Sequence, residues 1–464
     1  MTIWMPNIEN TRGPRYKAIV AAIEQAIDDK QLRPGQRLPT QREMANQLGL
    51  SVQTVSRAYE EAERRGLTAG EIGRGTFVQY RKPEQGEGFI TDSEQSNRLD
   101  YSNVMPVVSD LHIQVLKEAM AECARDSAIA RMMAYRPSQG IAEHRQAGAD
   151  WLEQNGVTAD ESDVIVTNGT AHGIWIAMSS LLEPGDVVAT EALVDSSVIT
   201  GASMLKTKLC GLQLDEQGIL PDALEEACRQ EPVKLLCITP VFNNPTASLM
   251  GEERCREIAA VAQRYNVAIV EDDVFGPLLP RHSKPIWSFA PERTYYVTSF
   301  TKALMPSLRT GYLTGPGEMM SRLVSRVRTT GWMSNTWTAE VAARWLHDGT
   351  AKRLIDWQRK KLKDRHKILT RALGSFELTA HASAMHAWLK LPEQWRSRQF
   401  VEQARSRGLL VTPPDPFIVG RAVEPHAVRL ALGDTNHEDR SFERGLGRLA
   451  ALLREYPDPI SAHD

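Results

Sequence analysis

A lysine that directly follows an apolar run is the residue of this sequence with the clearest potential for chemistry. Lys302 closes the segment Ser299-Phe300-Thr301-Lys302, which comes after the strand-like run TYYVT. Open α/β sheets bind ligands at the carboxyl ends of their strands, and an amine there can attack a carbonyl carbon. Two alternatives are a solvated loop lysine and a Ser-x-x-Lys nucleophile pair. The S-D-N and K-T-G tripeptides that accompany such a pair do not occur in the sequence.

Three further segments could complete a site around this lysine. Asp272 follows the apolar run VAIV and could keep a ring nitrogen protonated, although a solvated acidic turn is the alternative. The turn Asn168-Gly169-Thr170-Ala171 separates the run VIVT from a helical pattern, where free backbone N–H groups can bind a phosphate. Asn244 could donate to a ring oxygen, although its segment NNPT is also an ordinary turn. An amine, a carboxylate and an anion site are the groups that pyridoxal phosphate requires.

The elements that must position these residues alternate between strands and helices. Short apolar runs are separated by stretches of helix length, and they occupy Val164–Thr167, Val187–Thr190, Leu235–Thr239, Val267–Val270 and Tyr295–Thr298. This alternation predicts an α/β domain in which a parallel-rich sheet lies between helices. We expect the domain to cover residues 101–464 and to include a smaller C-terminal lobe from about Arg353.

A separate small module is predicted over residues 1–80, and the polar stretch 81–100 is predicted to be a linker. Thr40-Gln41-Arg42-Glu43 has the form of a capping box, and Gly49 is expected to end the helix that starts there. Ser51 can cap the next helix at once. The run AGEIGRGTFVQY, with Arg74 at its tip, then predicts a hairpin. These elements are typical of a winged helix-turn-helix, although a plain helical bundle would show a similar pattern.

The second of these helices has one apolar and one polar face. A buried stripe is predicted from the spacing of Val52, Val55, Tyr59 and Ala62. The side chains that this stripe turns outward are Gln53, Thr54 and Arg57. Amide, hydroxyl and guanidinium groups near the start of such a helix are suited to contacts in the major groove of DNA.

The segments of the large domain together resemble the fold-type-I aminotransferase family. They stand in that family's order and approximate spacing, as VTNGTAHG, TPVFNNPT, VEDDVFG, SFTKALMPSLRTGY and AVRLALG. The resemblance implies pyridoxal phosphate held as an aldimine (Schiff base) on Lys302, with its ring nitrogen on Asp272 and its ring oxygen near Asn244. The phosphate contacts that it implies are Thr170, Ala171, Ser299 and Arg309.

The same resemblance assigns roles to two further residues. It implies that Arg429 binds the carboxylate of an effector as a bidentate fork, for which a structural ion pair is the alternative. It also implies that Tyr135 reaches the phosphate of a neighbouring subunit. A homodimer is therefore expected.

Three positions depart from the family's pattern. Its D-x-x-Y motif becomes D-x-x-F here, so Phe275 lacks a phenol to hold the ring oxygen. Asp195 stands where an aromatic ring commonly stacks on the pyridine, and Ala247 replaces a glycine in N-P-T-G. Imine formation needs none of these groups, but their loss weakens the prediction of an efficient transaminase.

The N-terminal module closely resembles the DNA-binding domain of the GntR family, through LRPGQRLPTQREMANQLGLSVQTVSRAYEEAERRGL and GRGTFV. The DNA contacts that the resemblance implies are Arg42, Gln53, Thr54, Arg57 and, on the wing, Arg74. The family usually has a basic residue where Val52 stands, so one expected contact is missing. The whole chain resembles the MocR subfamily, in which a GntR-like domain is joined to an aminotransferase-like domain.

This resemblance implies a regulator that binds double-stranded operator DNA and senses an amino compound, either an amino acid or pyridoxal phosphate itself. One alternative is a catalytically competent aminotransferase. Another is a regulator whose effector binds without pyridoxal phosphate. Physiological enzyme activity is not expected.

Charge and cysteine content agree with this organisation. Residues 1–82 contain 13 Lys and Arg against 9 Asp and Glu, a net charge of +4, which leaves −7 for the remainder. A small basic module beside a larger acidic domain fits DNA binding by the module alone. Five cysteines without a C-x-x-C pair indicate reduced thiols and no metal site. We expect a cytoplasmic protein with no membrane segment.

Overall fold

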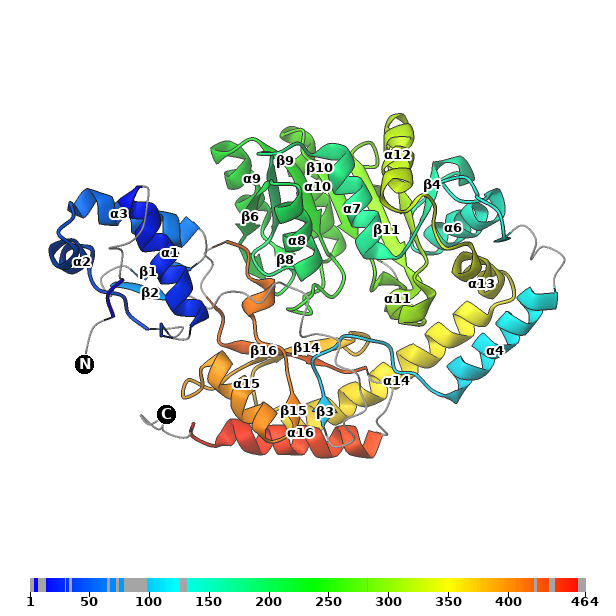
Figure 1. Ribbon diagram of the computed structural model, residues 1–464. Helices are drawn as coiled ribbons and strands as arrows, with labels where there is room; N and C mark the ends of the chain where they lie inside the picture. The colour runs from blue at the N-terminus through cyan, green and yellow to red at the C-terminus, as the bar shows by residue number, and fades with distance from the viewer. Residues whose placement is uncertain are drawn as a thin grey trace. The chain divides into compact units, whose positions relative to one another are not determined.

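The chain forms two compact units, Met1–Gly88 and Phe89–Asp464, each of which has its own hydrophobic core (Figure 1). In this computed structural model the described residues are 4–6, 14–29, 31–32, 36–64, 67–71, 75–78, 98–125, 132–281, 283–420, 424–433 and 439–457. Of the predicted linker, residues 81–97 lie outside the described part, and Leu99–Asp100 form a strand of the second unit.

Among its described residues, the first unit contains three helices and a hairpin, namely α1 (Arg15–Asp28), α2 (Gln41–Leu48), α3 (Val52–Arg64), β1 (Thr68–Glu71) and β2 (Gly75–Val78). Both hydrogen bonds of the predicted capping box join Thr40 and Glu43 at the start of α2. Gly49 ends α2 with a φ of 62°, in the left-handed region that glycine adopts at low cost. The predicted helix-turn-helix and hairpin are therefore confirmed.

The buried stripe of α3 is shorter than predicted. Val55, Tyr59 and Ala62 are buried, but Val52 is 46% exposed. Because side chains of a helix tilt toward its N-terminus, the side chain of the first residue extends past the end of α3 instead of over the core. The stripe is held in place by the hydroxyl of Tyr59, which donates to the carbonyl oxygen of Pro39 at 2.6 Å.

The second unit is built around one large sheet. Its strands are β4 (Val164–Thr167), β5 (Val187–Glu191), β6 (Lys208–Leu212), β9 (Val233–Ile238), β10 (Ala268–Asp272), β11 (Thr294–Ser299) and β12 (Gly311–Thr314). Their order is β4-β12-β11-β10-β9-β5-β6, and β12 runs antiparallel to both of its neighbours. The other paired strands are parallel. The parallel-rich sheet of the prediction is confirmed, with β6 and β12 in addition to the five predicted strands.

Helices cover both faces of this sheet (Figure 1). One face shares an apolar cluster with α7 and α12, and the other shares a separate cluster with α9 and α10. The helices of the unit whose residues the structure describes are α4 (Asp110–Arg125), α6 (Ala142–Gln154), α7 (Thr170–Leu181), α8 (Ser196–Met204), α9 (Pro221–Gln230), α10 (Glu252–Arg264), α11 (Phe300–Ala303), α12 (Met320–Gly331), α13 (Thr336–His347), α14 (Thr350–Leu373), α15 (Ser397–Ser406) and α16 (Asp439–Arg454). Among the described residues, no helix is both long and apolar enough to cross a membrane.

A smaller lobe completes the unit below the large sheet in Figure 1. Its strands are β13 (Leu378–Thr379), β14 (His386–Lys390) and β16 (Ala427–Ala431), and it also contains the pair β15 (Leu409–Leu410) and β3 (Leu99–Asp100). A short hairpin of the unit is formed by β7 (Leu214–Asp215) and β8 (Gly218–Ile219).

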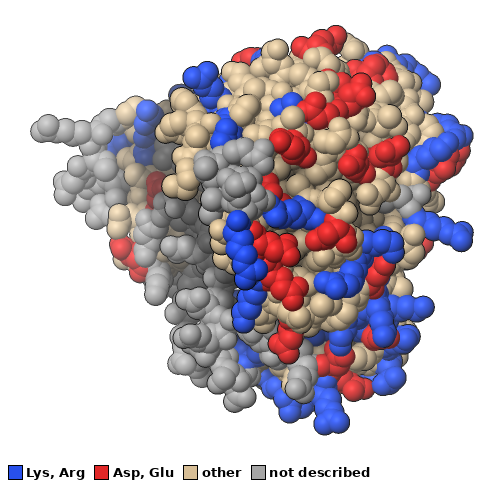
Figure 2. All heavy atoms as spheres, turned by 90° about the vertical axis from the view of Figure 1, so that its right-hand side faces the viewer, with Lys and Arg blue, Asp and Glu red and all other residues tan. Residues whose placement is uncertain are grey.

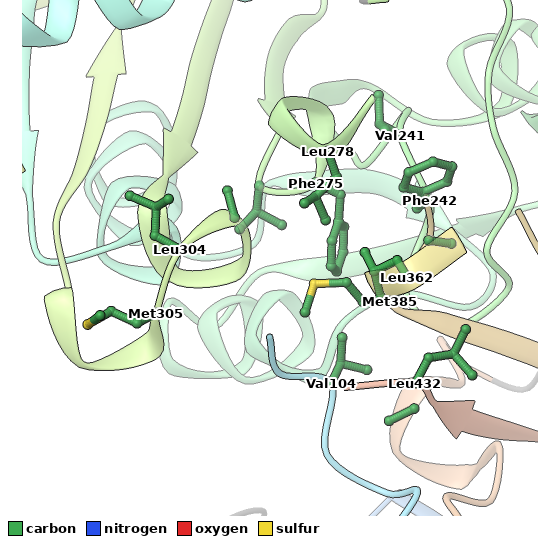
Figure 3. Packing of buried hydrophobic residues seen from close by; sticks show 14 of the residues in the cluster. Val104, Val241, Phe242, Phe275, Leu278, Leu304, Met305, Leu362, Met385 and Leu432 are labelled. Carbon is green, nitrogen blue, oxygen red and sulfur yellow. The ribbon is translucent and has the colours of Figure 1, made fainter. Parts of the chain in front are cut away.

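Apolar side chains join the smaller lobe to loops of the large sheet (Figure 3). Phe242 follows β9 and Phe275 follows β10, and both lie in one buried cluster with Leu362 of α14 and with Met385 and Leu432 of the smaller lobe. Burial of this size fixes the smaller lobe against the carboxyl ends of the strands.

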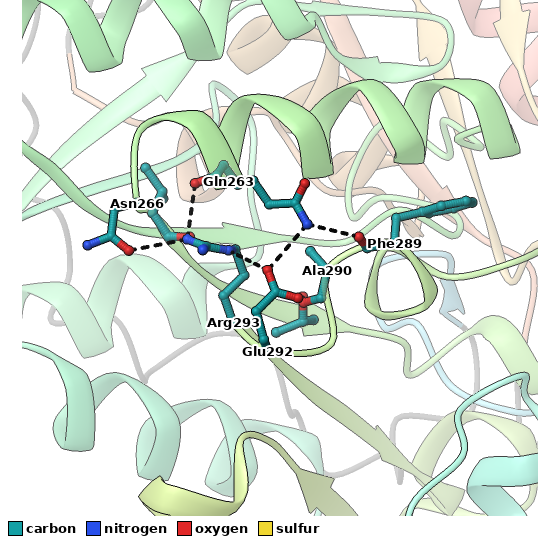
Figure 4. Close-up of polar contacts among 9 residues, drawn as sticks. Gln263, Asn266, Phe289, Ala290, Glu292 and Arg293 are labelled. Atoms are coloured by element: carbon teal, nitrogen blue, oxygen red, sulfur yellow. Dashed lines mark hydrogen bonds and ion pairs between the residues drawn. The ribbon is translucent and has the colours of Figure 1, made fainter.

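The opposite edge of the sheet is fixed by polar contacts (Figure 4). Arg293 donates through Nε to Glu292 and through Nη1 to the carbonyl oxygen of Ala262, at 2.9 and 3.3 Å. Gln263 of α10 donates to Glu292 at 3.2 Å. These bonds tie the end of α10 to the start of β11, the strand that pairs with β10 and therefore lies beside Asp272.

Candidate cofactor site and DNA interface

The parallel strands bring the predicted cofactor residues to one edge of the sheet. Asp272 is the last residue of β10, and Lys302 lies in α11 directly after β11, the neighbouring strand. The turn that begins with Asn168 follows β4, and Asn244 follows β9. Because β4, β9, β10 and β11 end at the same edge, Lys302, Asp272, Asn244 and the turn after β4 lie at that edge.

Lys302 is half-buried and has a lowered pKa. Its ammonium donates to the carbonyl oxygen of Val104. Burial is the main cause that lowers the pKa of Lys302 to about 8; the charge of Asp195 opposes this shift, and the charges of Arg429 and Arg309 add to it. At pH 7 roughly a tenth of such an amine is neutral. A neutral amine is the form that attacks an aldehyde.

Asp272 has the opposite perturbation. Burial, and then the nearby charge of Asp195, raise the pKa of Asp272 well above its ordinary value, against the N–H of Val274, which donates to it at 3.1 Å. A buried carboxyl of this kind needs a cation beside it in order to ionise. A protonated pyridine nitrogen is such a cation.

The turn after β4 has the features of an anion site. Gly169 precedes α7 with a φ of 86°, and no side chain caps the helix. The hydroxyl groups of Thr170 and Ser299 lie 2.7 Å apart, and Ala171 adds an N–H in the first turn of α7. Nη2 of Arg309 donates to the carbonyl oxygen of Asn168 at 3.0 Å. Backbone N–H groups, hydroxyls and a guanidinium thus surround one helix N-terminus.

A hydrogen-bonded chain runs from this edge into the smaller lobe. Asn244 donates through Nδ2 to Oδ2 of Asp195 at 2.7 Å, and its Oδ1 accepts from Nη1 of Arg429 at 2.7 Å. Arg429 also donates to the carbonyl oxygen of Ser102 and to the hydroxyl of Thr412. The contacts of Asp195 and Ser102 were not predicted from the sequence, because no local pattern signals them.

Several buried polar atoms at the site have no hydrogen-bond partner within the described part of the chain. They include Oγ1 of Thr301, next to Lys302, and Nε of Arg429. Because a buried donor without a partner is costly, the Nε of Arg429 indicates that an anion or acceptor is still to be supplied. The residues present therefore fit pyridoxal phosphate and a carboxylate-bearing ligand.

The departures seen in the sequence have structural consequences. Phe275 is buried and packs its ring 5.5 Å from that of His386. Burial, and then the charge of Arg429, lower the pKa of His386 to about 3, so this histidine is neutral at pH 7.

Tyr135 is 80% exposed, with its ring 5.5 Å from that of Trp332. Its role toward a second subunit stays a prediction.

The predicted DNA contacts lie on exposed parts of α2 and α3. Arg42, Gln53 and Arg57 are exposed, and the guanidinium of Arg57 lies 4.2 Å above the ring of Tyr16. Thr54 is half-buried, and its N–H and hydroxyl both bind the hydroxyl of Ser51. Arg74 lies outside the described residues.

Figure 2 shows how charged side chains are distributed on one face of the molecule. In this view the described acidic and basic side chains are intermixed, and the basic ones do not gather into a single patch. A binding surface for DNA needs an excess of Lys and Arg. The described side chains of this face therefore do not form the basic patch that DNA binding needs.

Comparisons with known proteins match a family to each of the two units of the chain. Residues 102–449 match the family of class I and II aminotransferases, and residues 15–78 match the gntR family of bacterial regulatory proteins. The HTH-type transcriptional regulator YdeF of Bacillus subtilis is 26% identical over 97% of this chain and 96% of its own length. YjiR of Escherichia coli, also named as an HTH-type transcriptional regulator, is 26% identical over 82% of this chain and 87% of its own.

Solved structures resemble the second unit. A kynurenine aminotransferase of Pyrococcus horikoshii, solved in complex with PMP, superimposes with a TM-score of 0.72 at 23% identity and covers 78% of this chain and 92% of its own. At this identity the likeness concerns the fold. The chain belongs to the class I and II aminotransferase family and carries a GntR-type helix-turn-helix domain, which is the combination found in the MocR subfamily of transcription regulators.

Proposed function

We propose that this regulator binds operator DNA through its first unit and holds pyridoxal phosphate on Lys302 of its second unit. An amino compound that enters the cofactor site then changes the affinity for DNA. The observation that supports the proposal is the convergence of Lys302, Asp272 and the N-terminus of α7 at one edge of the sheet. Bound pyridoxal phosphate supplies an aldehyde that exchanges one amine for another.

The residues of the chain have separate tasks in this proposal. Lys302 provides the amine, which its lowered pKa makes partly neutral at pH 7. Asp272 pairs with the ring nitrogen, and the N-terminus of α7 with Arg309 holds the phosphate. Arg429 binds the carboxylate of the incoming compound, to which its Nε, which has no partner among the described residues, can donate. The contact of Arg429 with Asn244 carries the presence of that carboxylate to the cofactor.

Two properties of the assembly belong to the same proposal. We expect a homodimer, because Met133, Tyr135, Trp332 and Trp337 are exposed large hydrophobic residues of one unit. We expect a cytoplasmic location, because the proposed target is operator DNA. Sedimentation of the purified protein tests the dimer, and a monomer with bound cofactor would contradict it.

The test of the sensing function combines a spectrum with a DNA-binding assay. We expect the purified protein to show a visible absorption band with pyridoxal phosphate, and Lys302→Ala to lack it. Fluorescence anisotropy with the DNA upstream of its own gene then measures whether the cofactor and added amino acids change the affinity. Identical DNA affinity in every ligand state would contradict sensing.

The same purified proteins also test the alternative that the chain is a working aminotransferase. Asp195 and Phe275 occupy positions where a stacking ring and a phenol are expected, and both losses disfavour efficient catalysis. We therefore expect no full cycle between an amino acid and a 2-oxo acid at enzyme-like rates. Sustained turnover would favour the enzyme.

A further inference from the structure

Asp195 is a charged residue of the cofactor site to which the proposed function assigns no role. In the proposed function, on which this inference rests, the phosphate pairs with Arg309, the ring nitrogen with Asp272, and the aldehyde with Lys302. Arg429 is assigned to the effector's carboxylate. Asp195, a half-buried residue, is the remaining charged group that acts on Lys302, Arg429 and Asp272 together.

Asp195 is held in a fixed position beside the effector's binding groups. Its Oδ1 accepts from the N–H of Ser197 at 2.9 Å, and this bond caps α8. Its Oδ2 accepts from Nδ2 of Asn244 at 2.7 Å, and the other end of that amide binds Arg429. Nη1 of Arg429 and Oδ2 of Asp195 are therefore separated by one amide group, at most about 8 Å. A small ligand can contact both.

A ligand whose only charged group beside its amine is a carboxylate would pair with Arg429 but leave Asp195 without a cation. Once its carboxylate binds Arg429, a second negative charge lies in the same partly buried site as Asp195. Like charges in a partly buried site repel, and a nearby cation removes the repulsion. A second negative charge on the ligand's side chain would strengthen the repulsion instead.

We propose that Asp195 is a specificity-determining residue that selects effectors with a second basic group, namely amino acids whose side chain carries an amine. The first amine of such a compound meets the cofactor at Lys302, its carboxylate binds Arg429, and its side-chain ammonium pairs with Asp195. This identifies the class of amino compound that the proposed sensor detects.

A purely structural role for Asp195 makes a different prediction. If the carboxylate served only to cap α8 and to orient Asn244, its replacement would weaken every ligand by a similar factor. A role in selection changes the ratio between ligands of different charge. The ratio is therefore the quantity to measure.

The experiment uses the full-length protein loaded with pyridoxal phosphate. Ornithine, norvaline and glutamate share a five-carbon skeleton and carry a cationic, a neutral and an anionic side chain. We expect ornithine to bind about ten- to hundredfold more tightly than norvaline, the range of a hydrogen bond to a charged group, and glutamate to bind most weakly. The change of the visible spectrum and titration calorimetry both report these affinities.

Variants of Asp195 and a matched control complete the test. Asp195→Asn removes the charge without a change of shape, and Asp195→Ser keeps an oxygen that can cap α8. Both variants should lose the advantage of ornithine over norvaline. Glu216→Gln removes the same charge at an exposed position between β7 and β8 and should keep the advantage.

The outcomes that overturn the inference differ from those that overturn the proposed function. If the native protein binds norvaline or glutamate as tightly as ornithine, or none of the three, Asp195 does not select for a cation. The same holds if its variants weaken all three equally. If the protein takes up no pyridoxal phosphate, the proposed function itself fails.

Discussion

Replacement of Gly169 by alanine should weaken the binding of pyridoxal phosphate through one steric contact. A Cβ at this position would lie 2.8 Å from Nη2 of Arg309, and the glycine has a φ of +86°. The clash displaces a guanidinium that we assign to the phosphate. Loss of one charge-assisted hydrogen bond costs about 1.5–3 kcal/mol, which corresponds to an affinity roughly ten- to hundredfold lower.

Alanine at a glycine with a positive φ also strains the backbone, and Gly185 provides a control for this strain. Gly185 has a φ of +96°, yet a Cβ built there meets nothing within 4 Å. It precedes β5, at the end of the strand opposite the cofactor site. Gly169→Ala and Gly185→Ala should therefore both lower the free energy of unfolding by about 1–3 kcal/mol. The affinity for the cofactor should fall in Gly169→Ala alone.

Absorbance titration or equilibrium dialysis with pyridoxal phosphate measures the affinity, and thermal unfolding measures the stability. The reasoning is refuted if Gly169→Ala binds the cofactor as tightly as the native protein does. It is also refuted if Gly185→Ala loses as much affinity, because strain alone would then explain the result.

Three further predictions concern other parts of the chain. Because only the neutral amine attacks and the pKa of Lys302 is about 8, the rate of cofactor uptake should rise about tenfold from pH 7 to 9 and then level off. Stopped-flow absorbance measures this rate, and a rate that continues to rise up to pH 10 would contradict the prediction. Arg57→Ala should weaken operator binding by about 1–3 kcal/mol in anisotropy titrations, and an unchanged affinity would remove Arg57 from the interface. Thr40→Ala removes one bond of the capping box and should destabilise the first unit by about 1 kcal/mol in thermal unfolding, with no change in cofactor affinity.

Local patterns in the sequence were sufficient for the elements that carry the site. The run VIVT is β4, and the runs before Asp272 and Lys302 are β10 and β11. Such strands are recognisable because a buried parallel strand is apolar on both faces. The capping box at Thr40 was also recognisable, because both of its bonds join residues three positions apart.

Features that depend on distant parts of the chain were missed. Val52 has the spacing of a core residue but is exposed, because the position of a helix end relative to the core is a tertiary property. Asp195 and Asn244 are 49 positions apart, and Arg429 reaches a carbonyl 327 positions away. Only the completed sheet and the smaller lobe bring these groups together. Asp195 was noticed as a departure from a family, but its partners required the structure.

The most direct test of the central claim is to find where pyridoxal phosphate attaches. Borohydride reduction of the loaded protein fixes the cofactor to its amine, and peptide mass spectrometry then locates the modified residue. The account predicts one modified lysine, Lys302, and no stoichiometric modification in Lys302→Ala. A modification at another lysine, or no modification of the native protein, would contradict it.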